Sequence, residues 1–229
     1  MKRHFLGYKI AALMLTACFA STAGATTFTY ADNKAGFLSA TSAVSIGALP
    51  SSGGSGTVVG LASFTDGPSA SIAFGFFSNE ILGNSIGISG VENFNVSFST
   101  FIYAIGLDIH EPSYVGGTSL PLGCNATCTD TTFEIQLLNG STSVGSFVYN
   151  APDDAGASSG GPLGFWGVHS SLPFNNIRVR DVTNTIDNEF FGNFSYSTVA
   201  AIPEPATTSM MLIGTLLLFA KYRSQRKRA

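Results

Sequence analysis

The chain has 229 residues, of which 26 are glycine and 19 are phenylalanine, but only 11% are charged. This mixture favours short strands and turns over long surface helices. Eight of the eleven Lys and Arg residues lie near the two ends, so the stretch between Thr26 and Pro203 has three bases against thirteen acids, a formal charge of −10. Because nucleic-acid binding needs clustered Lys and Arg, the composition excludes that role, and it leaves polycations, divalent metals and neutral sugars as acceptable partners.

Residues 1–25 have the layout of a secretory signal peptide. Basic residues at positions 2 and 3 precede an apolar stretch from Ile10 to Ala20, and small residues follow up to Ala25. We therefore expect signal peptidase to cleave after Ala25. An alternative remains open, because Leu15-Thr16-Ala17-Cys18 is similar to a lipobox, which would make Cys18 a lipidated first residue.

The stretch from Thr26 to Ala201 is predicted to be a succession of β-strands. Apolar and polar residues alternate in residues 94–98, 133–137 and 177–180, which places one face of each strand in a core and the other in water. Residues 101–110 are more continuously apolar and suit an inner strand, residues 133–150 predict a hairpin with its turn at Leu138–Ser141, and residues 191–200 predict the last strand. No window between residues 30 and 200 shows a helical period with caps.

About 175 residues are enough for one two-layer domain with a substantial core. We expect an all-β fold, with a single β-sandwich of jelly-roll or lectin-like kind over residues 26–201, and strand count alone does not separate it from an immunoglobulin-like sandwich. The predicted organisation is a signal peptide at 1–25, this domain at 26–201, and a C-terminal tail at 202–229.

Cys124 and Cys128 remain once the signal peptide is removed. An even pair of cysteines in an exported protein predicts a disulfide that stiffens a loop tip. The alternative, a metal site, needs further ligands, and His110 and His169 are the histidines of the predicted domain.

Acidic residues in predicted loops are candidates for Ca²⁺, which takes oxygen ligands. Solvated turn residues are the alternative interpretation, no run matches an EF-hand, and no other cofactor is predicted. The candidate ligands are Asp153, Asp154, Asp187 and Glu189.

Trp166 is the one tryptophan of the chain and lies near His169. Sugar sites usually present an aromatic face with a few polar groups, so these two residues are candidates for carbohydrate binding, and packing of Trp166 in the core is the alternative. Ser85 and Ser158 fit the pattern G-x-S-x-G, but a nucleophile elbow needs a helix after the serine, so flexible loops are the favoured interpretation.

The C-terminal tail begins with Pro203-Glu204-Pro205, in which the prolines keep Glu204 in an extended, accessible backbone. The fifteen residues 206–220 carry no charge. As a helix they would span about 22 Å, against about 30 Å for the hydrocarbon core of a bilayer, so a short transmembrane helix is predicted. A basic cluster would hold its end in the cytoplasm. Its members are Lys221, Arg223, Arg226, Lys227 and Arg228.

This order of motif, apolar helix and basic cluster resembles the PEP-CTERM sorting signal of exopolysaccharide-producing Gram-negative bacteria. The resemblance covers about the last 27 residues. It implies recognition and cleavage by exosortase, a multi-spanning membrane enzyme, after transient anchoring in the inner membrane, and release to the cell surface or matrix. A plain single-pass anchor is the alternative for the tail.

For the whole chain we expect an exported, non-catalytic component of exopolysaccharide or biofilm, structural or in contact with carbohydrate. The alternative is a secreted hydrolase that acts on polysaccharide or ester bonds.

Overall fold

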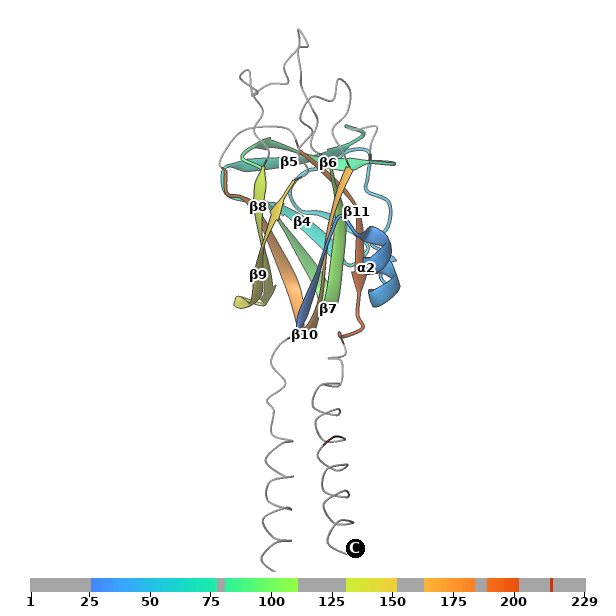
Figure 1. The fold of residues 1–229 in the computed structure, drawn as a ribbon. Coiled ribbons are helices and arrows are strands. Elements are labelled where there is room, and N and C mark those ends of the chain that lie inside the picture. Colours follow the sequence, from blue (N-terminus) through green and yellow to red (C-terminus); the bar gives the residue numbers. More distant parts are fainter. Residues whose placement is uncertain are drawn as a thin grey trace, which may run out of the picture. The chain divides into compact units, whose positions relative to one another are not determined.

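Antiparallel strands make up most of the chain that the computed structural model describes (Figure 1). The chain divides into two units, one of Thr27–Ile202 and one of Met1–Thr26 with Pro203–Ala229, and the strands that the structure describes belong to the first. The all-β prediction is confirmed for this unit. The described residues are 26–77, 81–110, 131–151, 163–183, 189–201 and 215.

The described elements follow one another in a simple order, with a single helix after the first strand. They are β1 (Thr27–Ala31), α2 (Lys34–Thr41), β2 (Val44–Ser45), β3 (Thr57–Val59), β4 (Ala62–Asp66), β5 (Ala70–Gly75), β6 (Ser85–Gly90), β7 (Phe94–His110), β8 (Thr132–Asn139), β9 (Thr142–Asn150), β10 (Leu163–Asp181) and β11 (Phe190–Ser197).

Helix α2 corrects the prediction that no helix lies between residues 30 and 200. Asn33 caps it, and the side-chain oxygen of Asn33 accepts a hydrogen bond from the Gly36 amide at 3.0 Å, which satisfies a donor of the first turn. The buried residues of the helix are Phe37 and Thr41, four apart. A helix of eight residues is too short for this period to stand out in the sequence.

The strands β7 and β10 run through both layers of the domain, because one eleven-stranded sheet folds over on itself. Their pairing changes register between His169 and Asn176, which divides each strand into two halves. The N-terminal half of β7 and the C-terminal half of β10 lie between β4 and β8, with β3 and β9 outside them, and we call these strands the groove layer. The other two halves lie between β1 and β11, with β6, β5 and β2 beyond, and we call these the helix layer.

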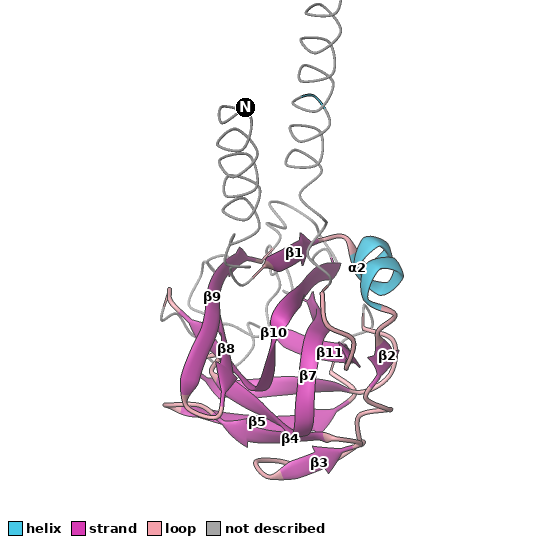
Figure 2. Cartoon of the chain, turned by 90° about the horizontal axis from the view of Figure 1, so that it is seen from below, coloured by secondary structure: helices cyan, strands magenta, loops and turns pink. Residues whose placement is uncertain are grey.

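The two layers face each other across one hydrophobic core, around which Figure 2 shows the strands. Phe94 of the groove layer packs against Phe191 of the helix layer, with ring centroids 4.7 Å apart. Phe64 likewise meets Phe194 at 5.1 Å. Each such ring contributes about 1.5–3 kcal/mol through burial, so these contacts hold the folded sheet closed.

Helix α2 covers the outer face of the helix layer at a pair of glycines. Gly106 of β7 and Gly167 of β10 are direct partners in the sheet. A Cβ on Gly106 would lie 2.6 Å from the ring of Phe165 and 2.8 Å from the ring of Phe37, so the glycines make the hollow that these rings fill. Phe37 is completely buried there.

Candidate functional site

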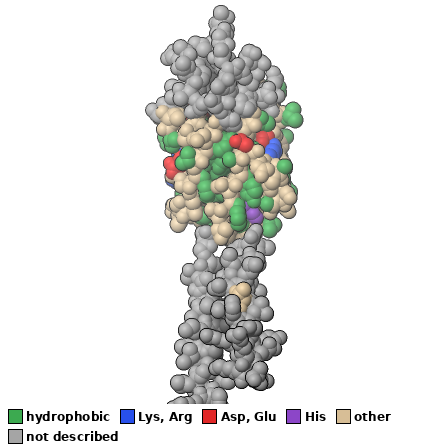
Figure 3. Space-filling view, viewed as in Figure 1, with side chains coloured by type: hydrophobic (Ala, Val, Ile, Leu, Met, Phe, Trp, Pro, Cys, Tyr) green, Lys and Arg blue, Asp and Glu red, His purple; other side chains and the backbone are tan. Residues whose placement is uncertain are grey.

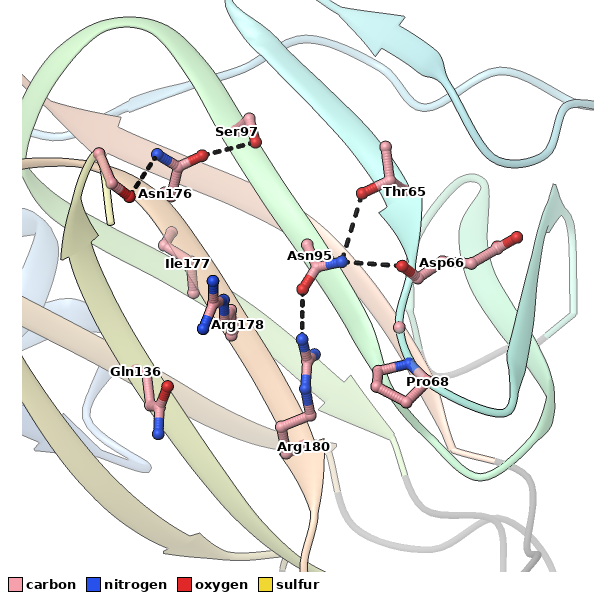
Figure 4. A pocket seen from close by; sticks show the side chains of 12 residues that line it. Thr65, Asp66, Pro68, Asn95, Ser97, Gln136, Asn176, Ile177, Arg178 and Arg180 are labelled. Atoms are coloured by element: carbon pink, nitrogen blue, oxygen red, sulfur yellow. Dashed lines mark hydrogen bonds between the residues drawn. The ribbon is translucent and has the colours of Figure 1, made fainter. Parts of the chain in front are cut away.

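A groove of about 760 Å³ crosses the outer face of the groove layer (Figure 4). Its floor comes from four neighbouring strands, β4, β7, β10 and β8, and the turns after β4 and β8 lie at its ends. The lining residues are Thr65, Asp66, Gly67, Pro68, Asn95, Ser97, Gln136, Gly140, Asn176, Ile177, Arg178 and Arg180.

Strand alternation explains why polar side chains gather in this groove. In β7, Asn95 and Ser97 are partly exposed, whereas the residues between and beside them are buried in the core. In β10, Arg178 is exposed between the buried Ile177 and Val179. Successive side chains of a strand point to opposite faces, so one face of each strand builds the core and the other builds the groove.

The sheet register places the groove residues in rows across the strands. Arg178 is opposite Asn95 of β7 on one side and Gln136 of β8 on the other. Asn176 is opposite Ser97, and the Ser97 hydroxyl donates a hydrogen bond of 2.7 Å to the Asn176 side chain. The rows alternate amides, a hydroxyl and a guanidinium, which are groups that bind polar ligands.

Arg180 is held in place by three hydrogen bonds. It donates to the carbonyl oxygens of Phe94 at 2.9 Å and Val179 at 2.6 Å, and to the side-chain oxygen of Asn95 at 2.5 Å. Asn95 in turn donates to the carbonyl oxygen of Asp66 at 2.8 Å. Burial lowers the pKa of Arg180, the positive charge of Arg178 lowers it further, and Glu134 acts in the opposite direction.

Glu134 of β8 lies beside the groove and is held on the side of β9. Its Oε1 accepts hydrogen bonds from the Ser146 hydroxyl at 2.6 Å and from the Gln136 amide at 3.0 Å. These two bonds, that of Ser146 first, lower the pKa of the Glu134 carboxyl, and the charge of Arg180 adds to them. Glu134 is therefore ionised at neutral pH and keeps Gln136 oriented.

Arg178 differs from Arg180, because no hydrogen bond or ion pair engages its guanidinium within the described part of the chain. Its side chain is exposed in the middle of the groove (Figure 4). All five N–H donors of this guanidinium are therefore available to a ligand.

A smaller pocket of about 410 Å³ lies beside the end of the β5–β6 hairpin. Its lining includes the exposed apolar side chains Phe76 and Leu82, together with Asn84 and Asn193. Residues 78–80, which lie between the two strands, are outside the described part of the chain.

Trp166 and His169, the two candidate residues for carbohydrate binding, do not form one site in the structure. Trp166 is 2% exposed and packs in the core, with its ring 6.0 Å from that of Phe147, so it offers no face to a surface ligand. His169 is also buried, and its Nε2 lies 3.1 Å from the carbonyl oxygen of Val199. Positions three apart on a strand point to opposite faces, so this pair does not form one site, and the core interpretation of Trp166 replaces it.

Of the candidate Ca²⁺ ligands, Glu189 lies within the described residues and is completely buried. Asp153, Asp154 and Asp187 lie outside them. Among the described residues, no group of three or more His, Cys, Asp or Glu side chains is arranged to hold a metal ion.

Ser85 begins strand β6 and pairs with Gly75 of β5. A strand within an antiparallel sheet is not the strand-to-helix turn that a nucleophile elbow requires, so the G-x-S-x-G pattern at Ser85 has no catalytic meaning. Ser158, in the other match to the pattern, lies outside the described residues.

The remaining candidate residues also lie outside the described part of the chain. These are Cys124 and Cys128, the Pro203-Glu204-Pro205 motif, and the basic cluster from Lys221 to Arg228. Within the described residues, no helix has the length and apolar content needed to cross a bilayer.

Sequence reasoning missed the groove itself. It identified the strand with Arg178 and Arg180 on one face, but nothing in the sequence showed which strands would lie beside it. The signal that could have found the groove is the recurrence of Asn, Ser, Gln and Arg on the outward faces of several predicted strands.

No family model matches the chain, and no curated protein matches it. Among solved structures it is similar to a family 29 carbohydrate-binding module, at 11% identity over 71% of this chain and 98% of that chain, with a TM-score of 0.42. It is also similar to the family 11 carbohydrate-binding module of the cellulosomal cellulase Lic26A-Cel5E of Clostridium thermocellum, at 13% identity over 64% and 93%, with a TM-score of 0.33.

An arabinose-bound α-L-arabinofuranosidase, MgGH51, is similar at 12% identity over 58% of this chain, with a TM-score of 0.40, and this chain spans 23% of that enzyme's length. At these identities and TM-scores, the likenesses identify no ligand for this chain.

Proposed function

We propose that this chain is an exported, non-catalytic component of a bacterial surface or extracellular matrix, and that its groove binds exopolysaccharide. The domain is, in this proposal, a β-sandwich of jelly-roll or lectin-like kind that presents the outer face of the groove layer to the polymer. The observation that carries the proposal is the groove of about 760 Å³, whose floor of amide, hydroxyl and guanidinium groups spans four strands.

Three properties of the groove favour a polysaccharide over a smaller ligand. Strands lie about 4.8 Å apart, so the distance from β4 to β8 is about 14 Å, which suits several linked sugar rings better than one. Its polar groups are spread along this length instead of converging on one point, as they would around a single reacting atom. They are also held by the sheet and by each other, which lowers the entropy cost of binding a flexible polymer.

The proposed route to the matrix rests on the two ends of the chain. Signal peptidase removes residues 1–25 during export, and the short apolar helix at 206–220 then anchors the chain in the inner membrane. The basic cluster 221–228 fixes the orientation. Exosortase acts at Pro203-Glu204-Pro205 and releases the domain to the cell surface or matrix.

Binding is tested with the full chain, purified in mild detergent and sedimented with insoluble exopolysaccharide. The parent should sediment with the polymer, and Gln136→Ala should sediment less, because Gln136 lines the groove. Thr142→Ala is the matched control, since Thr142 is exposed at the start of β9 and does not line the groove. Failure to bind any member of a panel of neutral and acidic polysaccharides would overturn the proposed function.

Sorting is tested separately by mass measurement of the mature protein from cells with and without exosortase. The form made with the enzyme should lack the residues after the Pro-Glu-Pro motif. Glu204→Ala should leave an unprocessed, membrane-bound species, and unchanged release of this variant would contradict the assignment of the tail.

A further inference from the structure

We propose that the polymer bound in the groove is acidic, and that Arg178 binds its carboxylate groups. This inference rests on the proposed function and assigns the substrate class of the same site. The inference differs from the expectation drawn from the composition, which placed neutral sugars among the acceptable partners because the domain is acidic.

Most of the positive charge of the domain lies in the groove. Three bases stand between Thr26 and Pro203, and two of them, Arg178 and Arg180, line the groove. The third, Lys34, is 2.6 Å from Asp108 on the helix layer and is neutralised by that carboxylate. On the face shown in Figure 3, Lys and Arg side chains are sparse. The groove is therefore the place where an otherwise acidic domain presents cations to a ligand.

The two arginines of the groove differ in how their guanidinium groups are held. Arg180 is fixed by bonds to two carbonyl oxygens and to Asn95, so its guanidinium is a stationary positive charge. Arg178 keeps its donors free, and after burial its positive charge is the second cause that lowers the pKa of Arg180, through repulsion between the two guanidinium groups. A carboxylate bound to Arg178 would relieve this repulsion, and the fork of the guanidinium matches a carboxylate bidentately.

The acids near the groove do not neutralise Arg178. Glu134 is bonded to Ser146 and Gln136 on the side of β9 and is paired in register with Arg180. Asp66, the last residue of β4, accepts a hydrogen bond at its Oδ1 from the Ile72 amide of β5 at 2.9 Å, which engages this carboxylate. Asn95 and Gln136 flank Arg178 on either side, and both are neutral amides that bind sugar hydroxyls.

No aromatic ring is among the described residues that line the groove. Neutral sugars are held largely by stacking on aromatic faces, and single-stranded nucleic acids by stacking of their bases. Without a ring, the groove recognises its ligand through hydrogen bonds and charge. The domain carries a formal charge of −10 and therefore repels polyanions. Nucleic acid, with about one charge per 1.7 Å of duplex, has a higher charge density than a polysaccharide with one carboxylate per sugar ring, so the domain repels nucleic acid more strongly.

The experiment compares polygalacturonate with the same polymer after its carboxyl groups have been reduced to alcohols. Binding of the full chain, purified in mild detergent, is measured by affinity electrophoresis at low and high salt. The parent should bind polygalacturonate in preference to the carboxyl-reduced polymer. Its binding should weaken with salt, because the ion pair between Arg178 and the polymer carboxylate is exposed.

Three variants separate the guanidinium from the fold and from overall charge. Arg178→Gln should bind polygalacturonate about tenfold more weakly, because a charge-assisted bidentate contact is lost. Arg178→Lys keeps the positive charge but loses the bidentate geometry of the guanidinium, so its affinity for polygalacturonate should lie between that of the parent and that of Arg178→Gln. Val44→Glu changes the net charge by the same amount on the helix layer, where its side chain is 56% exposed, and should bind like the parent.

The outcomes distinguish this inference from the proposed function. Equal binding of polygalacturonate by Arg178→Gln and the parent would overturn the role of Arg178. Equal or tighter binding of the carboxyl-reduced polymer by the parent would overturn the acidic substrate class, but would leave a carbohydrate-binding groove. Absence of binding to both polymers and to the wider polysaccharide panel would overturn the proposed function itself.

Discussion

Replacing Lys34 with Met should destabilise the domain more than replacing Asp108 with Asn, although both changes break the same ion pair. Lys34 Nζ lies 2.6 Å from Asp108 Oδ2, but the Lys34 side chain is 39% exposed and that of Asp108 only 1%. Lys34→Met leaves a carboxylate in the interior, still bonded to Asn193 at 2.8 Å. Asp108→Asn leaves an ammonium group that turns into water on its flexible stem.

The magnitude follows from this difference in exposure. Breaking a fully buried ion pair by removing one partner costs about 3–5 kcal/mol. The exposed end of Lys34 lets water screen this pair, so we expect a loss of about 2–3 kcal/mol in the free energy of unfolding for Lys34→Met. Asp108→Asn keeps an acceptor for Asn193 and should lose about 1 kcal/mol. For a domain of this size each kcal/mol corresponds to about 2–4 °C in Tm.

The assay is urea unfolding of the full chain in mild detergent, followed by tryptophan fluorescence. Trp166 is the one tryptophan of the chain and is 2% exposed in the core, so its emission reports the loss of this fold. Val44→Met, at an exposed position of β2, is the control and should match the parent. An equal loss for the two variants, or a larger loss for Asp108→Asn, would refute the reasoning from exposure.

Three further predictions concern the core, the glycine hollow and the groove. Phe191→Ala should cost about 3–5 kcal/mol in urea unfolding, because its ring packs against Phe94 at 4.7 Å across the two layers, and a loss below 1 kcal/mol would contradict this role. Gly106→Ala should lower Tm through a loss of about 1–3 kcal/mol, since its Cβ would lie 2.6 Å from the buried ring of Phe165, and an unchanged Tm would show that the hollow has room. For Glu134→Gln, the lowered pKa of Glu134 means that its stabilisation is present above the unfolded-state pKa and lost as the pH falls through the folded-state pKa. The variant should therefore be slightly less stable than the parent at pH 7, and this deficit should disappear once the pH has fallen below the folded-state pKa of Glu134. A deficit that persists in acid below that point would exclude the carboxylate as its cause.

Strand positions were predictable because each strand has one face in a single core. The alternation at residues 94–98, 133–137 and 177–180 indicated strands within β7, β8 and β10, and the hairpin of β8 and β9 was confirmed around Gly140, whose φ of 60° fits a tight turn. Period-two burial is a local signal, so a single sequence carries it.

Partnership between distant strands was not predictable in the same way. The groove depends on β10 lying between β7 and β8, which are joined to it by hydrogen bonds and not by neighbouring sequence. The sequence likewise gave no sign that Gly106 and Gly167 would be direct partners beneath Phe37. Sugar binding and core packing both stayed open for Trp166, because a single tryptophan in a sequence does not reveal which face of its strand meets the core.

The passage of β7 and β10 through both layers has a mechanical consequence for the link between the groove and the C-terminal end of the domain. The strand β11, from which the chain leaves the domain, pairs with the C-terminal half of β7, while the groove lies on the opposite halves of β7 and β10. If the groove holds a polymer as proposed, a load on it would reach β11 through the continuous backbone of β7, and not only through hydrogen bonds between strands.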